Sequence, residues 1–199
     1  MRTPKRLIVT LAGLLLAAAG ALTTATPASA VSIPIAGSFT NYGSGKCFGP
    51  VPGPDGNYFV NGLPIQQFSC DVGDTHGPGG WATFIVGNVT VNGQSRLAFQ
   101  IINGTSGQCL DDRDGRTSDR SPVQQWTCNR TSTTMQWVRG DDLNGAWQLL
   151  NVRALQNGGS ACLDVAGGSL QDGAALQLYH CTAQNTAQHF YRTNFGMPA

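Results

Sequence analysis

The sequence predicts an all-β fold in which three related repeats share one core. Composition gives the first indication: 12% of the 199 residues are charged, 26 are glycine, and none of the acidic residues is Glu. Short runs of Val, Ile, Thr and aromatic residues are separated by Gly, Asn, Asp and Pro, as in short strands joined by turns. The second indication is a cysteine-centred pattern that occurs three times.

The first 30 residues have the composition of a signal peptide. Three basic residues among the first six precede an apolar stretch from Leu7 to about Leu22, and the small residues Ala28-Ser29-Ala30 follow. Residues 31–199 contain no further apolar stretch of the roughly 20 residues that a spanning helix needs. We therefore expect a secreted, extracellular domain over 31–199 with no membrane span.

The charges of this domain argue against nucleic acid as a partner. After removal of the signal peptide, nine basic residues face eleven aspartates, so no basic surface is expected. The three histidines, His76, His180 and His189, show no metal-ligand spacing. We expect no metal and no cofactor.

Six cysteines in an exported chain are expected to pair, although composition alone allows 15 pairings. Cys109 and Cys128 have the same spacing, 19 positions, as Cys162 and Cys181. The flanking segments also align, and a third copy lies upstream; the aligned segments are 65–70, 123–128 and 176–181. Pairing within each repeat is then the natural choice, and the three expected disulfides are Cys47–Cys70, Cys109–Cys128 and Cys162–Cys181.

The repeats extend over approximately 35–86, 97–139 and 147–192, and each is too small to bury an apolar face alone. Trp81, Trp137 and Phe190 recur at the ends of the repeats, so we expect them in the shared core. Two alternating pairs before the first cysteine of a repeat have the same interpretation: Phe99 with Ile101, and Trp147 with Leu149.

The repeated motif has an Asp two positions after the first cysteine, a Gln four before the second, an aromatic residue two before it, and a closing Gln-x-aromatic element. This motif resembles that of the ricin B-chain-like lectin family, and the resemblance covers nearly all of residues 31–199. It implies a β-trefoil of three repeats with intra-repeat disulfides, and carbohydrate as the partner.

The resemblance also implies the site residues. In the family the Asp accepts hydrogen bonds from sugar hydroxyls, the Gln supports the Asp, and the aromatic ring stacks on the sugar face. The matching positions are Asp111, Gln124 and Trp126 in the second repeat, Asp164, Gln177 and Tyr179 in the third, and Gln188 in the closing motif. We expect Asp164 to lie exposed in a groove.

Three departures from the family pattern bear on the sites. Gly49 stands at the Asp position of the first repeat, so this repeat is not expected to bind sugar. The family often has Asn before the closing Gln, whereas this chain has Thr134 and Ala187. Asn185 could replace that Asn in space.

Less specific interpretations of these residues stay open. Asp111 and Asp164 could be turn residues, and the glutamines could serve strand packing. The charged segment from Asp112 to Arg120 fits a solvated loop better than a sugar contact.

The function implied is binding of galactose-type sugars, or of a plant polysaccharide such as xylan, by the second and third repeats. Catalysis is not expected, because the candidate carboxylates lie in separate repeats and no GxSxG or HExxH motif occurs. The alternative is a β-trefoil protein-binding or protease-inhibitor module that uses the proline-rich insertion at 49–64.

Overall fold

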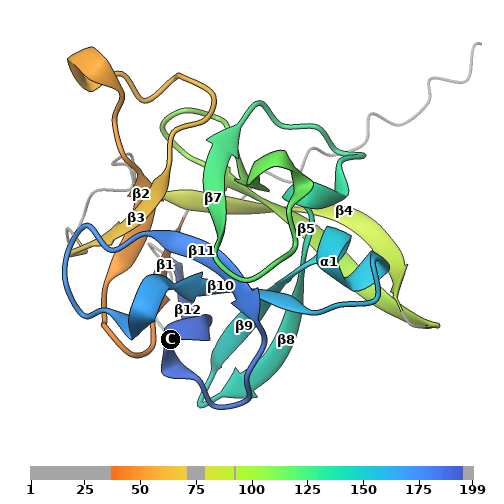
Figure 1. Ribbon diagram of the computed structural model, residues 1–199. Coiled ribbons are helices and arrows are strands. Elements are labelled where there is room, and N and C mark those ends of the chain that lie inside the picture. The colour runs from red at the N-terminus through yellow and green to blue at the C-terminus, as the bar shows by residue number, and fades with distance from the viewer. Residues whose placement is uncertain (1–36, 71–78, 92, 195–199) are drawn as a thin grey trace, which may run out of the picture. The chain divides into compact units, whose positions relative to one another are not determined.

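The computed structural model describes residues 37–70, 79–91 and 93–194 (Figure 1). All of them belong to the unit Ile33–Ala199. The predicted signal peptide at 1–30 lies outside the described residues. No helix within the described ranges is long and apolar enough to cross a membrane.

Short strands dominate the described residues, as the turn-rich sequence predicts. The strands are β1 (Gly37–Asn41), β2 (Cys47–Pro50), β3 (Ile65–Phe68), β4 (Trp81–Val91), β5 (Gln94–Asn103), β6 (Cys109–Asp112), β7 (Ser121–Trp126), β8 (Trp137–Leu143), β9 (Ala146–Asn151), β10 (Ala161–Val165), β11 (Leu176–His180) and β12 (His189–Asn194). One short α-helix, α1 (Val152–Gln156), and five 3-10 turns complete the described elements: η1 (Pro54–Gly56), η2 (Arg113–Gly115), η3 (Thr133–Met135), η4 (Ala166–Gly168) and η5 (Thr186–Gln188).

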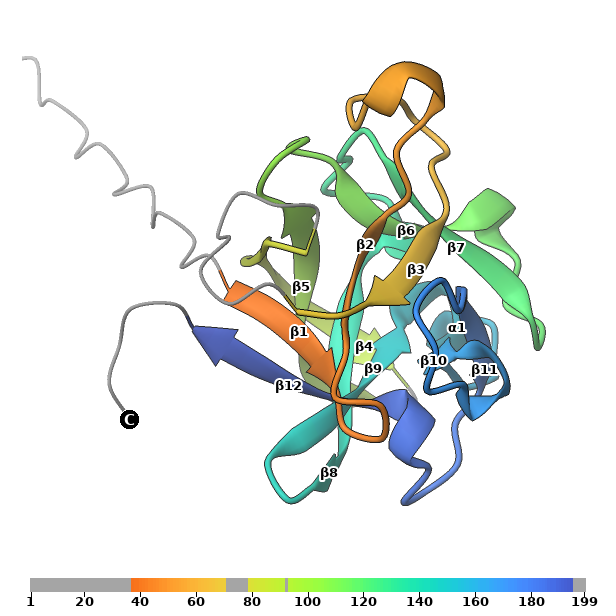
Figure 2. The ribbon, with the colours of Figure 1, turned by 90° about the vertical axis from the view of Figure 1, so that its left-hand side faces the viewer.

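Six of these strands close into a barrel. Strand β1 pairs with β4, β4 with β5, β5 with β8, β8 with β9, and β9 with β12. The ring closes where β12 returns to β1, with Arg192 opposite Phe39 (Figure 2). A closed ring leaves no unpaired edge strand in the barrel.

The other six strands form three hairpins, β2–β3, β6–β7 and β10–β11, and each hairpin contacts the next. Gln177 pairs with Pro122, while isolated bridges join Pro64 to Gln124 and Gln66 to Ala175. A six-stranded barrel joined to three mutually paired hairpins is the β-trefoil, so the predicted fold class is confirmed.

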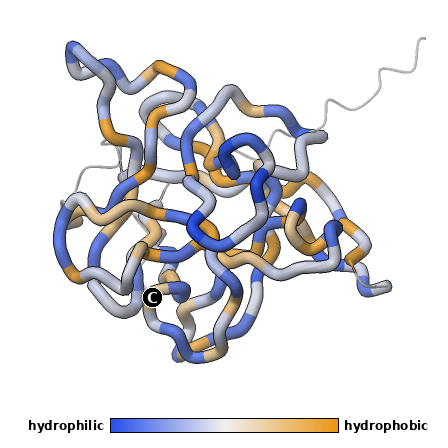
Figure 3. Tube along the Cα trace, viewed as in Figure 1, coloured by the Kyte–Doolittle hydropathy of each residue, from blue (hydrophilic) through white to orange (hydrophobic). Residues whose placement is uncertain are grey.

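The aromatic residues predicted for the core are buried at equivalent places. Trp81, Trp137 and Phe190 are at most 1% exposed, and the two indole N–H groups donate to the carbonyl oxygens of Phe48 (2.8 Å) and Leu110 (3.1 Å). Hydrophobic and hydrophilic stretches alternate over short distances along the trace, as expected of strands with one face in the core (Figure 3).

Trp147 is an exception among the predicted core residues. Phe99, Ile101 and Leu149 are buried as expected, but Trp147 is only partly buried and lines a cavity in the barrel. The prediction for Trp147 was therefore wrong, because strand alternation identifies an inward face and not how deep a residue lies along the barrel.

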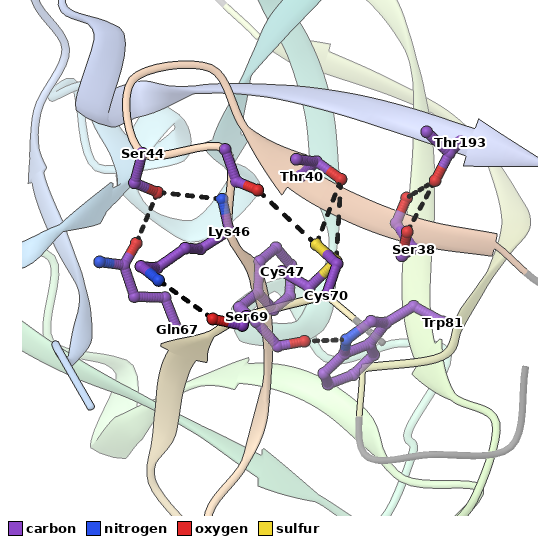
Figure 4. Close-up of a disulfide and its surroundings, with 12 residues drawn as sticks. Ser38, Thr40, Ser44, Lys46, Cys47, Gln67, Ser69, Cys70, Trp81 and Thr193 are labelled. Carbon is purple, nitrogen blue, oxygen red and sulfur yellow. Dashed lines mark hydrogen bonds between the residues drawn. A yellow bond between two sulfur atoms is a disulfide. The ribbon is translucent and has the colours of Figure 1, made fainter. Parts of the chain in front are cut away.

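The three disulfides have the pairing that the repeats predict. They join Cys47 to Cys70, Cys109 to Cys128 and Cys162 to Cys181, and the described cysteines include no free thiol. In the chain-entropy account, each loop of 19 to 23 residues contributes about 3 kcal/mol of stability. Figure 4 shows the first of these bonds beside Thr40 and the indole of Trp81.

Two of the three hairpins are each fastened to a loop of another repeat by one buried glutamine. Gln67 Nε2 donates to the carbonyl oxygens of Ser169 (2.7 Å) and Gln171 (2.8 Å). Gln125 Nε2 donates to those of Tyr58 (2.6 Å) and Val60 (3.1 Å) in the insertion of the first repeat. The repeats are thus linked by side chains as well as by strand pairing.

Replacing Gln125 with Leu, the residue type at the equivalent Leu178, is expected to release the insertion. The carbonyl oxygens of Tyr58 and Val60, which lie in a partly exposed loop, would lose their donor, at a cost of roughly 0.5–1.5 kcal/mol for each hydrogen bond. Hydrogen exchange at the Gly62 amide, which donates to Gln125 O, should accelerate. The matched variant Gln67→Leu should instead loosen residues 169–171 and leave Gly62 protected; equal protection of Gly62 in wild type and Gln125→Leu would contradict this.

Candidate functional site

The strand register brings together the Asp and Gln of each candidate site. Asp111 lies opposite Gln124 across β6–β7, and Asp164 lies opposite Gln177 across β10–β11. In both repeats the Gln Nε2 donates to an Asp carboxylate oxygen at 2.8 Å. The same pair of side chains is therefore built twice.

Both aspartates are buried, which differs from the exposed groove position expected for Asp164. Asp111 is 5% exposed and Asp164 is 4% exposed. Burial raises the pKa of both carboxyl groups, and the hydrogen bonds from Gln124 and Gln177 oppose this rise. Because both residues lie in strands, the alternative that they are turn residues is excluded.

Each pair lies in a cleft with an aromatic residue at its side. The cleft of the second repeat has a volume of about 860 Å³ and is lined by Asp111, Gln124 and 42%-exposed Trp126. The cleft of the third repeat is smaller, about 380 Å³, and is lined by Asp164, Gln177 and partly exposed Tyr179. The Gln and the aromatic residue are two positions apart on one strand, so both side chains project from the same face.

Thr134 supplies a hydrogen bond to the site that the sequence did not reveal. Its Oγ1 donates to Asp111 Oδ1 at 2.6 Å, opposite the bond from Gln124 to Oδ2. In the third repeat Ala187 cannot do this, but Asn185 lines the cleft and its side chain accepts from the Ala187 N–H at 3.1 Å. The one signal in the sequence was that Thr134 stands where the family often has an Asn that contacts the sugar.

The insertion of the first repeat reaches the cleft of the second. Arg113 donates from Nε to Gln124 Oε1 (3.1 Å) and from Nη2 to the Gly62 carbonyl oxygen (3.3 Å). A Cβ atom on Gly62 would lie 3.6 Å from the Trp126 ring. Gln124 and Trp126, which line this cleft, therefore lie beside a segment that is more than 45 residues away in sequence.

Gln188 does not line the third cleft, although its side chain hydrogen-bonds to Asp164 and thereby opposes the rise in the pKa of that carboxyl. Gln188 is fully buried; its Nε2 donates to the His180 carbonyl oxygen (2.9 Å), and its Oε1 accepts from the Thr182 N–H (2.8 Å). At the aligned position of the second repeat, Met135 Sδ accepts from the Asn129 N–H at 3.3 Å. These contacts hold the chain between the second cysteine and the closing motif.

Asp112 is not part of a solvated loop. It is 0% exposed, it borders the second cleft, and within the described part of the chain neither of its carboxylate oxygens has a hydrogen-bond partner. Burial, reinforced by the negative charge of Asp111, raises its pKa to about 8. The equivalent residue of the third repeat is Val165, which belongs to the apolar core.

The first repeat keeps the strand pairing but not the carboxylate. Gly49 lies opposite Gln66 in β2–β3, where the other repeats place their Asp. Phe68 stands at the aromatic position and is partly buried, with its ring against Gly79. Among the described residues no group of three or more His, Cys or Asp side chains is placed to hold a metal ion.

Solved structures with the same fold include three that illustrate its range. ThreeFoil, a designed threefold symmetric protein, is 21% identical with a TM-score of 0.62, over 79% of this chain and 97% of that one. The exo-β-1,3-galactanase 1,3Gal43A of Clostridium thermocellum is 24% identical with a TM-score of 0.61, over 80% of this chain and 30% of that one. The C-terminal half of an earthworm R-type lectin, solved with GalNAc, is 14% identical with a TM-score of 0.55, over 80% and 98% of the two chains.

Sequence comparison gives the family. No curated protein sequence matches the chain. The family model described as ricin-type beta-trefoil lectin domain-like matches residues 81–179, close to half of the sequence, in the part that carries both Asp–Gln pairs. With its trefoil topology, its three disulfides and this match, the chain belongs to the ricin-type β-trefoil lectin-like family.

Proposed function

We propose that the protein is a secreted lectin that binds carbohydrate in the clefts of the second and third repeats and catalyses no reaction. The observation that carries this proposal is the repeated arrangement of a buried Asp–Gln pair at 2.8 Å beside an accessible aromatic ring. Strand packing alone does not require a buried carboxylate at this place, since the first repeat folds with Gly49 there.

The chemistry of the clefts suits a sugar. A carboxylate already oriented by an amide keeps lone pairs for neighbouring hydroxyl groups, and a Trp or Tyr face suits the C–H surface of a pyranose. The buried carboxylates lose most of their water when the protein folds. The free-energy cost of desolvating them is therefore already met, and a sugar hydroxyl can bind them without a large further desolvation cost. Single sites of this kind are weak, and two clefts on one chain add avidity on polyvalent glycans.

We further propose galactose-type sugars or xylan as ligands. The second cleft, at about 860 Å³, has room for more than one sugar unit, whereas the third, at about 380 Å³, suits a terminal residue. The preference should therefore differ between the two clefts, with the polysaccharide favouring the second.

The test is binding of the mature protein to an array of glycans and polysaccharides, beside an Asp111→Asn, Asp164→Asn double variant. Asn keeps the volume of the buried side chain but removes its charge, and we expect binding to fall at least tenfold. Asp141→Asn, at an exposed strand position, is the matched control and should bind like wild type. Unchanged binding by a folded double variant would refute the assignment of the clefts.

The insertion supports a second candidate, a protein-binding function. Phe59 is 67% exposed and Val60 42% exposed, while the backbone around them is held by Gln125. Apolar side chains on a fixed loop are suited to a protein contact. A folded wild-type protein that binds nothing on the array would favour this candidate over the lectin.

A further inference from the structure

The barrel contains a cavity that is separate from both clefts. Its volume is about 500 Å³, within the range of roughly 300–1,000 Å³ usual for small-molecule sites. Every barrel strand contributes to its lining, since Phe39 comes from β1, Thr83 from β4, Leu97 from β5, Val138 from β8, Trp147 from β9 and Arg192 from β12. The cavity is thus the mouth of the barrel.

The floor and walls of this mouth are apolar. Phe39, Phe99 and Val138 are buried and form the floor. Ile85 and Leu97 stand higher on the β4–β5 hairpin and are 61% and 53% exposed, although both are large aliphatic residues. An apolar ligand in the mouth would remove these side chains from water, which favours its binding.

Three arginines, Arg96, Arg139 and Arg192, complete the lining, and among the described lining residues none is acidic. The Arg139 guanidinium lies 3.4 Å from the centroid of the Trp147 ring, which fixes it against the wall. Burial lowers the pKa of Arg139, and burial together with the charge of Arg139 lowers that of Arg192. Asp142, opposite Trp147 on the β8–β9 hairpin, accepts a hydrogen bond from the Gly145 N–H at 3.0 Å.

An excess of positive charge beside apolar walls is costly to desolvate unless an anion accompanies it. Arg guanidinium groups bind carboxylates with two parallel hydrogen bonds, which favours a carboxylate over a diffuse anion. We propose that the barrel mouth binds an aliphatic carboxylate, with its apolar chain on the floor of Phe39, Phe99 and Val138 and its carboxylate at Arg139 and Arg192.

The test is a titration of the protein with sodium dodecanoate, followed by Trp fluorescence and calorimetry at concentrations below micelle formation. Saturable binding with one equivalent is expected, and 1-dodecanol, which has the same chain without the charge, should bind at least tenfold more weakly. The Arg139→Gln, Arg192→Gln double variant should lose at least tenfold in dodecanoate affinity. Arg116→Gln, exposed and outside the cavity lining, is the matched control and should bind like wild type.

A separate arm keeps this site distinct from the lectin clefts. The Asp111→Asn, Asp164→Asn variant should bind dodecanoate normally, and the arginine double variant should bind glycans normally. Equal affinity for dodecanoate and 1-dodecanol, or for wild type and the arginine variant, would overturn the proposal. So would self-association of the protein that Leu97→Asp abolishes without any saturable dodecanoate binding, because a second copy would then occupy the mouth.

Discussion

Replacing Asp112 with Val is expected to stabilise the protein at neutral pH by roughly 2–4 kcal/mol. The folded state raises the pKa of this buried carboxyl from 3.8 to about 8, so folding at pH 7 requires a proton that the unfolded chain does not hold. The equivalent Val165 shows that this place in the fold accepts a β-branched apolar side chain.

The pH dependence gives the sign of this effect. Below about pH 4 the carboxyl is protonated in both states, so Asp112 costs little beyond an unsatisfied buried group. As pH rises from about 4 to 8, the unfolded state ionises first and the wild type loses stability relative to the variant. Urea unfolding of both proteins at several pH values should therefore show a difference that grows up to about pH 8 and then stays constant.

The matched control is Asp141→Val at an exposed position of β8. It makes the same substitution without removing a buried charge, so its stability should stay within about 0.5 kcal/mol of wild type. A stability difference for Asp112→Val that does not vary with pH would show that the carboxyl titrates normally in the folded protein.

Replacing Trp137 with Ala is expected to cost about 3–5 kcal/mol of unfolding free energy, while Trp126→Ala should cost less than about 1 kcal/mol. Trp137 is fully buried and donates to the Leu110 carbonyl oxygen, so its loss leaves both a cavity and an unsatisfied acceptor. Trp126 is 42% exposed at the edge of the second cleft.

The same pair of variants separates stability from binding. In an Asp164→Asn background, where only the second cleft is intact, Trp126→Ala should reduce glycan binding several-fold with little change in melting temperature. Trp137→Ala should instead act mainly by lowering the melting temperature. If Trp126→Ala left glycan binding unchanged in that background, Trp126 would not be the stacking residue.

Cysteine spacing and repeated motifs predicted the topology because both leave a direct trace in the sequence. Equal spacing of Cys109–Cys128 and Cys162–Cys181 identified the repeats, and the recurrence of Trp81, Trp137 and Phe190 identified the shared core. The register that sets Asp opposite Gln follows once each hairpin is known, since cross-strand neighbours are fixed by the turn.

Burial depth and contacts between repeats could not be predicted in the same way. Asp112 begins a charged segment whose composition is typical of a loop. Its alignment with the buried Val165, however, indicates a buried strand position. The contact of Gly62 with Arg113 and the exposure of Trp147 in the barrel mouth depend on how the repeats meet. No sequence pattern within a single repeat predicts these contacts between repeats.

The strand pairing that closes the barrel also constrains how the chain can fold. Five residue pairs join β1 to β12, whereas single pairs join it to β2 and to β4, so the first strand completes its pairing only when nearly all of the chain is available. Each disulfide spans only 19 to 23 positions and can form within its own repeat beforehand. Because long-range pairing is slow, we expect oxidised repeats to accumulate before the barrel closes, with the N-terminal strand as the last to dock.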